Sequence, residues 1–438
     1  MKMKSKFFLL ASLAIGSLCV SCAAGDDDDD GAPVSNNGGV IYSPESGSYE
    51  SYSGDSMNGS VGGDSGPRDD GGWSGRDGGS SGGEGDPYHN PNNRTSGRLT
   101  AGEWNDLDNW KFWTSLLNEN KFYDKVEYWK FFPKNLVAVQ VVDANNDGIA
   151  NVPVELMNGN DVEFAAKTDN KGMAYCWINM FDGEGKEYTA EDFALKVDGA
   201  ISDAGVKITT RASETIDVNV IVSENSKQPE AKADIAFIVD ATGSMSDEIE
   251  FLISDLEYII EHATANKKVA LRTAALFYRD TDDEYLTKHN DFSDDVAVTQ
   301  KYVSQQHAEG GGDYPEAVHT ALEKSLQNLS WNESARARIA FLILDAPAHH
   351  YEDVVASLQK SIKLYAKQGI KIIPVAASGV DKDTEFMLRF FDLATGGTYV
   401  FLTDDSGIGG SHIEASVGDY EVEYLNDLLV RLIKKYTE

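Results

Sequence analysis

The chain contains few cysteines and comparatively few basic residues. Only three of its 438 residues are cysteine, and two of these lie within the first 22 positions. A framework of disulfide bonds is therefore not expected. The 38 Lys and Arg residues are outnumbered by 72 Asp and Glu residues, which gives a formal net charge of −34. Because such a polyanion repels the phosphate backbone, we expect no nucleic-acid partner.

The first 22 residues have the composition of an export signal. Three lysines precede the apolar run 7–18, which is too short to span a bilayer as a stable helix. The run leads into LCVSC, residues 18–22, which resembles a bacterial lipobox. This resemblance implies that residues 1–21 are a lipoprotein signal peptide and that Cys22 is lipidated and anchors the chain in a membrane. An ordinary cleaved signal peptide is the alternative.

Residues 22–97 lack the apolar side chains that a folded core requires. They are rich in Gly, Ser, Asp and Asn and nearly devoid of aliphatic residues. Such a stretch cannot offset its ordering entropy, so we expect a disordered stalk. Its acidic run 26–30 resembles the surface-export signal of lipoproteins in some Gram-negative lineages, with a solvated tether as the alternative. The expected location is the outer membrane. If the acidic run is a surface-export signal, the chain is expected on the cell surface.

Two further segments precede the longest patterned region. Residues 98–135 carry closely spaced aromatic residues, which predict a helical segment packed on its neighbours. Residues 136–228 contain short apolar runs separated by Asn, Asp and Gly turns and resemble the carboxypeptidase-regulatory-like family, which implies a small β-sandwich. Asp143 opens a match to a calcium loop, but Val154 stands where that loop needs Glu, so a plain turn is expected. The strands expected here are 136–142, 152–156, 165–169, 172–178 and 216–222.

Strand and helix patterns alternate over residues 232–438. This alternation predicts an α/β fold with a doubly wound parallel sheet. Apolar runs predict strands at 235–239, 269–278, 339–344, 370–375 and 399–402. Apolar residues at helical spacing predict helices over 249–260, 318–326, 354–365 and 422–432. Pro315 suits a first helical turn, and Gly369 should cap the C-terminus of the third helix.

Three oxygen-bearing side chains directly follow the first of these strands. Asp240, Thr242 and Ser244 can direct their oxygens at one point, because Gly243 lets the loop fold tightly. Magnesium and calcium prefer oxygen ligands, so the spacing predicts a site for a hard divalent cation. Asp345, which ends the strand 339–344, is expected to lie near the same edge of the sheet.

This motif resembles the metal-ion-dependent adhesion site of the von Willebrand factor A (vWA) family, whose pattern is Asp-x-Ser/Thr-x-Ser. The resemblance implies a metal at the C-terminal edge of the strands, with a later acidic ligand at the position of Asp345. Where the family has a Thr on a middle loop, this chain has Asp313, which would make the ion less attractive to an outside carboxylate. The expected cofactor is Mg²⁺, with Mn²⁺ or Ca²⁺ as alternatives, and the expected ligands are Asp240, Thr242, Ser244, Asp313 and Asp345.

The expected function is a tethered module that binds a protein ligand through its metal face, as in adhesion. No catalytic residue is predicted, because the pair His349 and His350 lacks a His-Glu-x-x-His helix and Ser244 lacks a nucleophile elbow. The histidine pair is expected to form part of a polar loop beside the metal. A structural subunit of an envelope complex with metal-independent binding is the alternative, and a metal-dependent hydrolase is a less favoured one.

Overall fold

The computed structural model describes residues 96–118, 121–183, 188–265 and 268–438. All of them belong to one compact unit. The predicted signal peptide, the lipidation site Cys22 and nearly all of the predicted stalk lie outside these residues, so those assignments stay predictions. Among the helices that are described, none is both long and apolar enough to cross a bilayer.

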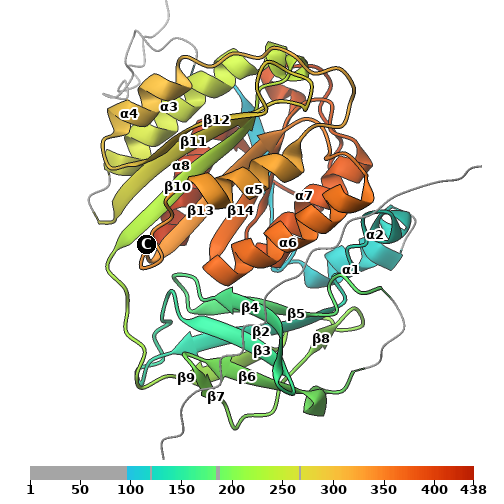
Figure 1. Ribbon diagram of the computed structural model, residues 1–438, viewed down its shortest axis with the longest axis vertical. Coiled ribbons are helices and arrows are strands. Elements are labelled where there is room, and N and C mark those ends of the chain that lie inside the picture. The colour runs from blue at the N-terminus through green and yellow to red at the C-terminus, as the bar shows by residue number, and fades with distance from the viewer. Residues whose placement is uncertain (1–95, 119–120, 184–187, 266–267) are drawn as a thin grey trace, which may run out of the picture. The chain divides into compact units, whose positions relative to one another are not determined.

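An eight-stranded mixed sheet forms the centre of the larger part of the structure (Figure 1). In spatial order, its strands are β12 (Thr287–Ser293), β11 (Ala270–Tyr278), β10 (Lys232–Asp240), β13 (Ala337–Leu344), β14 (Ile370–Ala376), β15 (Tyr399–Leu402), β1 (Thr100–Trp104) and β16 (Val422–Tyr424).

The strands from β11 to β15 are parallel, whereas the pairings β11–β12, β15–β1 and β1–β16 are antiparallel. The expectation of a wholly parallel sheet is therefore corrected to a parallel centre with antiparallel margins. The physical reason for the antiparallel β11–β12 pair is connectivity. A short loop joins these two strands, whereas parallel neighbours need a long crossover connection.

Helices cover both faces of this sheet (Figure 1). One face carries α3 (Ile249–Ala265), α4 (Val296–Val303) and α8 (Leu425–Thr437), and the other carries α5 (Val318–Asn328), α6 (Glu352–Gln368) and α7 (Lys382–Thr395). Successive side chains of a strand point to opposite faces. Accordingly, Phe237 and Val239 of β10 pack in the core beneath α3 and α8, and Ile238 packs in the core beneath α5, α6 and α7. Burial on both faces explains why β10 is apolar without alternation.

The structure confirms one predicted helix end and differs from the prediction at two others. Gly369 caps α6 in the left-handed conformation, with φ of 68°, as predicted. Helix α5, in contrast, begins at Val318, beyond the turn that contains Pro315. Val422 belongs to the edge strand β16 rather than to the closing helix, which begins at Leu425. Its side chain is exposed, as an outermost strand allows.

The aromatic segment 98–135 contains a strand as well as two helices, α1 (Trp110–Asn118) and α2 (Tyr123–Trp129). Its strand β1 lies between β15 and β16, so this segment completes the large sheet. Aromatic rings from the segment stack on α7, with 6.2 Å between the ring centroids of Trp113 and Phe386 and 4.2 Å between those of Phe131 and Phe390. The segment therefore shares a hydrophobic core with the α/β region.

The region between these parts forms two four-stranded sheets. One sheet contains β5 (Met173–Ile178), β2 (Asn135–Val142), β8 (Thr209–Thr210) and β9 (Val218–Val222), and the other contains β4 (Asp161–Lys167), β3 (Pro153–Asn158), β6 (Phe193–Val197) and β7 (Ala200–Ile201). Strand β4 starts earlier than predicted, and Asp169 lies in the turn after it. Asp143 Oδ1 accepts hydrogen bonds from the backbone N–H groups of Asn145 and Asp147, at 2.8 and 2.9 Å, as in a plain turn. Three short 3₁₀ helices complete the described elements: η1 (Ala190–Asp192), η2 (Gly243–Asp247) and η3 (Asp404–Ser406).

Candidate metal centre

The loop after β10 brings three of the predicted ligands together. Asp240 ends the strand, and both the backbone N–H and the hydroxyl of Thr242 donate to its Oδ1, at 2.9 and 2.7 Å. The hydroxyl of Thr242 lies 3.2 Å from that of Ser244. Gly243 is required for this loop because a Cβ there would lie 2.7 Å from the carbonyl oxygen of Gly310. The short spacing in the sequence thus becomes a cluster of oxygen atoms in space.

Two further buried carboxyl groups belong to this edge of the sheet. Asp345 directly follows β13, the neighbour of β10, and Glu316 lies just before α5. The exposed fractions of Asp240, Asp345 and Glu316 are 0%, 4% and 2%. The backbone N–H of Glu316 donates to the carbonyl of Pro347 at 2.8 Å, which fixes its loop against the loop that carries Asp345.

Burial and mutual repulsion disfavour the charged forms of these groups. Burial raises the pKa of Asp240 to about 7, and the charge of Asp345 adds to the effect. Burial likewise raises the pKa of Glu316 to about 9, with further contributions from the charges of Asp240, Asp280 and Asp345. The charges that raise the pKa values of these two carboxyl groups all come from neighbouring aspartates.

Two buried oxygens of this cluster lack a hydrogen bond within the described residues, and the hydroxyl of Tyr278, which interacts with Asp240, is unpaired as well. Asp240 Oδ2 and Glu316 Oε2 have no hydrogen-bond partner among the residues that the structure describes. Buried polar atoms normally find a partner, and an unpaired carboxylate oxygen in a protein interior is costly. A hard divalent cation would satisfy both atoms, because carboxylate and hydroxyl oxygens are its usual ligands. The residues present therefore fit Mg²⁺.

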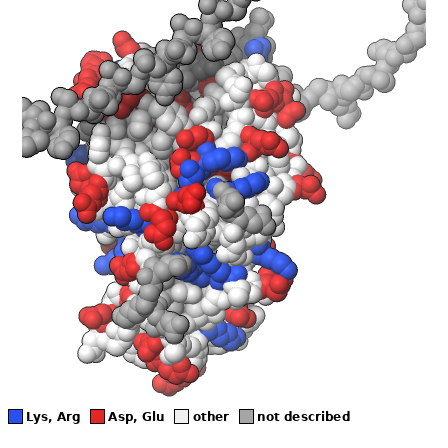
Figure 2. Space-filling view, turned by 90° about the vertical axis from the view of Figure 1, so that its right-hand side faces the viewer, with Lys and Arg blue, Asp and Glu red and all other residues white. Residues whose placement is uncertain are grey.

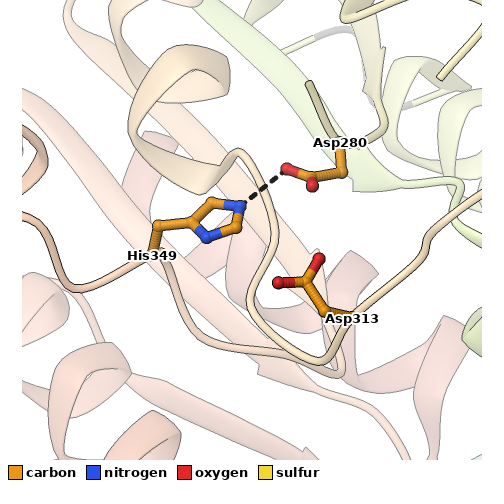
Figure 3. Close-up of side chains that lie close together, drawn as sticks. All are labelled: Asp280, Asp313 and His349. Atoms are coloured by element: carbon orange, nitrogen blue, oxygen red, sulfur yellow. Dashed lines mark hydrogen bonds and ion pairs between the residues drawn. The ribbon is translucent and has the colours of Figure 1, made fainter. Parts of the chain in front are cut away.

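The structure adds Glu316 to the residues predicted from the sequence and gives Asp313 a different setting. Asp313 is exposed and lies in the wall of an open hollow that Ser244 and Glu316 also line. Its carboxylate lies near the side chains of Asp280 and His349 (Figure 3). One potential metal-ligand atom from each of these three residues lies within 4.8 Å of the other two. One signal could have drawn attention to Glu316 in the sequence, namely an acidic residue directly after Pro315 at the start of an expected helix.

The two adjacent histidines have different partners. His349 is buried, and its Nε2 lies 2.9 Å from Asp280 Oδ1. His350 is exposed, and its ring stacks on that of Tyr128 at a centroid distance of 3.6 Å. Only His349 therefore belongs to the carboxylate-rich edge of the sheet.

Residues 234–391 match the family model described as the von Willebrand factor A domain. This match supports a vWA domain in this part of the chain. The matched residues include Asp240, Thr242, Ser244, Glu316 and Asp345, and the mixed α/β sheet flanked by helices agrees with that fold. A vWA domain supports a role in protein–protein interaction in general terms. The β-rich region before it lies outside the match, so its resemblance to a carboxypeptidase-regulatory-like domain stays a prediction.

Two curated proteins resemble part of the chain. One is the "Putative ariadne-like RING finger protein R811" of Acanthamoeba polyphaga mimivirus, with 31% identity over 121 residues, 28% of this chain and 12% of that protein. The other is the "Alpha-protein kinase vwkA" of Dictyostelium discoideum, with 29% identity over 177 residues, 37% of this chain and 28% of that protein. The chain therefore spans only a minor part of either relative.

Two solved structures also resemble part of the chain. One is a conserved hypothetical protein, BatB, from Bacteroides thetaiotaomicron, with 11% identity, a TM-score of 0.32 and coverage of 46% of this chain and 98% of the other. The second is proximal thread matrix protein 1 from the mussel byssus, with 14% identity, a TM-score of 0.31 and coverage of 48% and 46%.

Proposed function

We propose that the vWA domain binds one divalent cation, Mg²⁺ or Mn²⁺, and presents it to an acidic group of a protein partner. The proposed ligands are Asp240, Thr242, Ser244 and Asp345, joined by Glu316. Asp313, the other ligand expected from the sequence, lines the same hollow as Ser244 and Glu316, and we assign it instead to the cluster with Asp280 and His349. The observation that carries the proposal is the pair of buried oxygens, Asp240 Oδ2 and Glu316 Oε2, without a hydrogen-bond partner among the described residues.

The position of the site supports access for a partner. Ser244 is exposed, and the hollow that it lines with Asp313 and Glu316 opens to solvent. An ion bound below this hollow would have its inner side occupied by buried carboxylates and its outer side available to a ligand. On the face of the molecule shown in Figure 2, Lys and Arg side chains lie among Asp and Glu side chains.

Calorimetric titration of the whole chain with Mg²⁺ or Mn²⁺ tests the cation site. Wild type should bind one ion at this site, and Asp240→Ala should abolish that binding. Asp294→Ala is the matched control, because Asp294 is an exposed aspartate outside the cluster. Unchanged affinity in Asp240→Ala would refute the site.

Partner binding should depend on the ion. In pull-downs from envelope extracts, a chelator, Thr242→Ala and Asp345→Ala should each weaken capture of the same partner while circular dichroism shows an intact fold. Capture that persists in all three would favour the alternative, a structural subunit whose binding does not use the metal. Ion-dependent turnover of a peptide, glycan or phosphoester that Asp240→Ala abolishes would instead establish a hydrolase, against the non-enzymatic role proposed here.

The proposal includes a membrane tether. Cys22 follows a lipobox-like sequence, and a lipid on it would hold the vWA domain at the outer membrane, with the acidic run 26–30 favouring the cell surface. Cys22→Ser should release the chain from the membrane fraction. Proteolysis of intact cells would then distinguish surface exposure from a periplasmic orientation.

A further inference from the structure

We propose a second metal site, for a transition-metal ion such as Zn²⁺, formed by Asp280, Asp313 and His349. The three side chains come from three separate parts of the vWA domain, namely the end of β11, the loop before α5 and the loop after β13. Figure 3 shows them pointing toward a common space. This site shares no ligand with the cation site proposed above, so either can exist without the other.

The spacing of the ligand atoms is close to what one ion needs. Atoms bound at about 2.1 Å lie at most ~4.2 Å apart across the ion. The three ligand atoms here lie within 4.8 Å of one another, and the exposed Asp313 is free to close the remaining difference by a small movement. The 2.9 Å between His349 Nε2 and Asp280 Oδ1 suits two neighbouring ligands of one ion.

The surrounding structure holds these ligands in place. Asp283 Oδ2 accepts a hydrogen bond from the backbone N–H of Asp280 at 3.0 Å. The same carboxylate accepts from the backbone N–H of Gly311, two residues before Asp313, at 3.0 and 2.9 Å for its two oxygens. The ring of Tyr351 stacks on that of His349 at 5.6 Å with an interplanar angle of 12°. The loops that carry the ligands are thus tied together before any ion binds.

A simple buried Asp–His hydrogen bond explains only part of this arrangement. It accounts for Asp280 and His349, whose exposed fractions are 7% and 9%. It does not account for Asp313, whose carboxylate comes from a third segment of the chain and points toward the same space. A metal ion bound by all three side chains would account for each of them.

The ligand types determine the class of ion. An imidazole nitrogen suits Zn²⁺, Cu²⁺, Fe²⁺ and Ni²⁺, whereas Mg²⁺, Ca²⁺ and Mn²⁺ prefer oxygen ligands. The cation site on the β10 loop offers only oxygens, so the two sites should differ in selectivity. Three protein ligands would leave positions open to water, and an ion here would hold the Asp313 loop, which borders the first site, in one conformation.

Titration of the whole, untagged chain with Zn²⁺, in the presence of saturating Mg²⁺, tests this site. We expect one Zn²⁺ site whose affinity falls at least about tenfold in both His349→Ala and Asp313→Asn. Because Asp313 is exposed, Asp313→Asn should fold normally. His350→Ala is the matched control, since it removes the adjacent histidine, whose ring stacks on Tyr128 instead. It should leave Zn²⁺ affinity unchanged.

Different variants test the two proposed metal sites, so one site can be refuted without the other. Asp240→Ala should remove Mg²⁺ binding and keep the Zn²⁺ site, whereas His349→Ala should do the reverse. Zn²⁺ binding that survives both His349→Ala and Asp313→Asn, or that falls equally in His350→Ala, would overturn the second site and leave the first untouched. Loss of Zn²⁺ binding only in Asp240→Ala would likewise overturn it, by assigning the ion to the β10 loop. Replacing Zn²⁺ by Co²⁺ gives an independent measurement, because its visible absorption should change in His349→Ala.

Discussion

Two groups of buried carboxylates in this chain differ in what neutralises them. In the first group, Arg389 lies between Asp106 and Glu385, with its guanidinium nitrogens 2.6 and 2.9 Å from the Asp106 oxygens and 3.2 Å from Glu385 Oε1. All three side chains are 0% exposed. In the second group, neighbouring aspartates raise the pKa values of Asp240 and Glu316. The first group contains its own counter-cation, and the second is the group to which we assign a cation from solution.

This difference shows that a buried charge alone does not mark a functional site. Asp106 belongs to the segment before α1 and Arg389 to α7, so their ion pair joins two distant parts of the chain and serves the fold. The neighbouring carboxylates hold the pKa of Arg389 above its usual value even though burial opposes this. The second group lies at an edge of the sheet that opens to solvent near Ser244. What indicates function there is the missing compensation together with an accessible position.

Removing the internal cation should produce the largest effect. Arg389→Met would leave Asp106 and Glu385 buried without their shared cation, with Trp104 as the remaining donor to Asp106 and with Lys382 and Ser416 as remaining partners of Glu385. Breaking a buried ion pair in this way costs about 3–5 kcal/mol. The free energy of unfolding in urea, compared with that of wild type under the same conditions, measures the loss. A cost below about 1 kcal/mol would mean that the pair is not the structural link described above.

Supplying the external cation should have the next largest effect. Saturating Mg²⁺ at roughly 100 times its dissociation constant should stabilise wild type by about 2.7 kcal/mol. Without metal, Glu316→Gln should be more stable than wild type, because it removes a buried and repelled carboxyl group. With metal it should gain less than wild type, because it lacks one ligand. Thermal unfolding of both proteins with and without Mg²⁺ measures this reversal, and parallel behaviour of the two would exclude Glu316 as a ligand.

The stability of the metal-free protein should fall as the pH rises from 5 to 9. In the native state, Asp240 and Glu316 retain protons up to pKa values of about 7 and about 9. The unfolded chain releases the same protons near pH 4, so it binds fewer protons in this window and gains relative stability as the pH rises. Each such proton contributes at most about 1.4 kcal/mol per pH unit. Saturating Mg²⁺ should flatten the dependence, and Glu316→Gln should remove the part between pH 7 and 9. Urea unfolding at a series of pH values measures it, and an equal slope in Glu316→Gln would contradict the assignment.

The sequence was sufficient where the pattern was local. The apolar run 399–402 predicted β15 with its observed bounds, and Gly369 predicted the end of α6. The spacing of Asp240, Thr242 and Ser244 predicted that their oxygens would come together, because three residues on one tight loop have little freedom to separate. These features depend on residues close in the chain.

The sequence was insufficient where distant residues decide the outcome. Strand β1 reads TAGEW, which lacks a strong strand pattern, and it is defined by pairing with β15 and β16 far along the chain. Similarly, β12 is mostly polar because it is an edge strand of the sheet. Asp280 and His349 are 69 residues apart, and no local spacing relates them. The role of Glu316 depends on its burial, which only the packed structure reveals.

An exposed ion pair should give the smallest effect and thereby calibrate the first prediction. Arg431 lies 2.8 Å from Glu103 and also pairs with Glu423, but its side chain is 45% exposed. Water already solvates these charges, and Lys435 lies 2.9 Å from Glu103 and would still neutralise it after the change. Arg431→Met should therefore cost only about 0–1 kcal/mol in urea unfolding, and that small cost should shrink further at high salt. An equal loss of unfolding free energy in Arg431→Met and Arg389→Met would mean that burial does not distinguish these two arginines. The contrast between compensated and uncompensated carboxylates would then lose its physical basis.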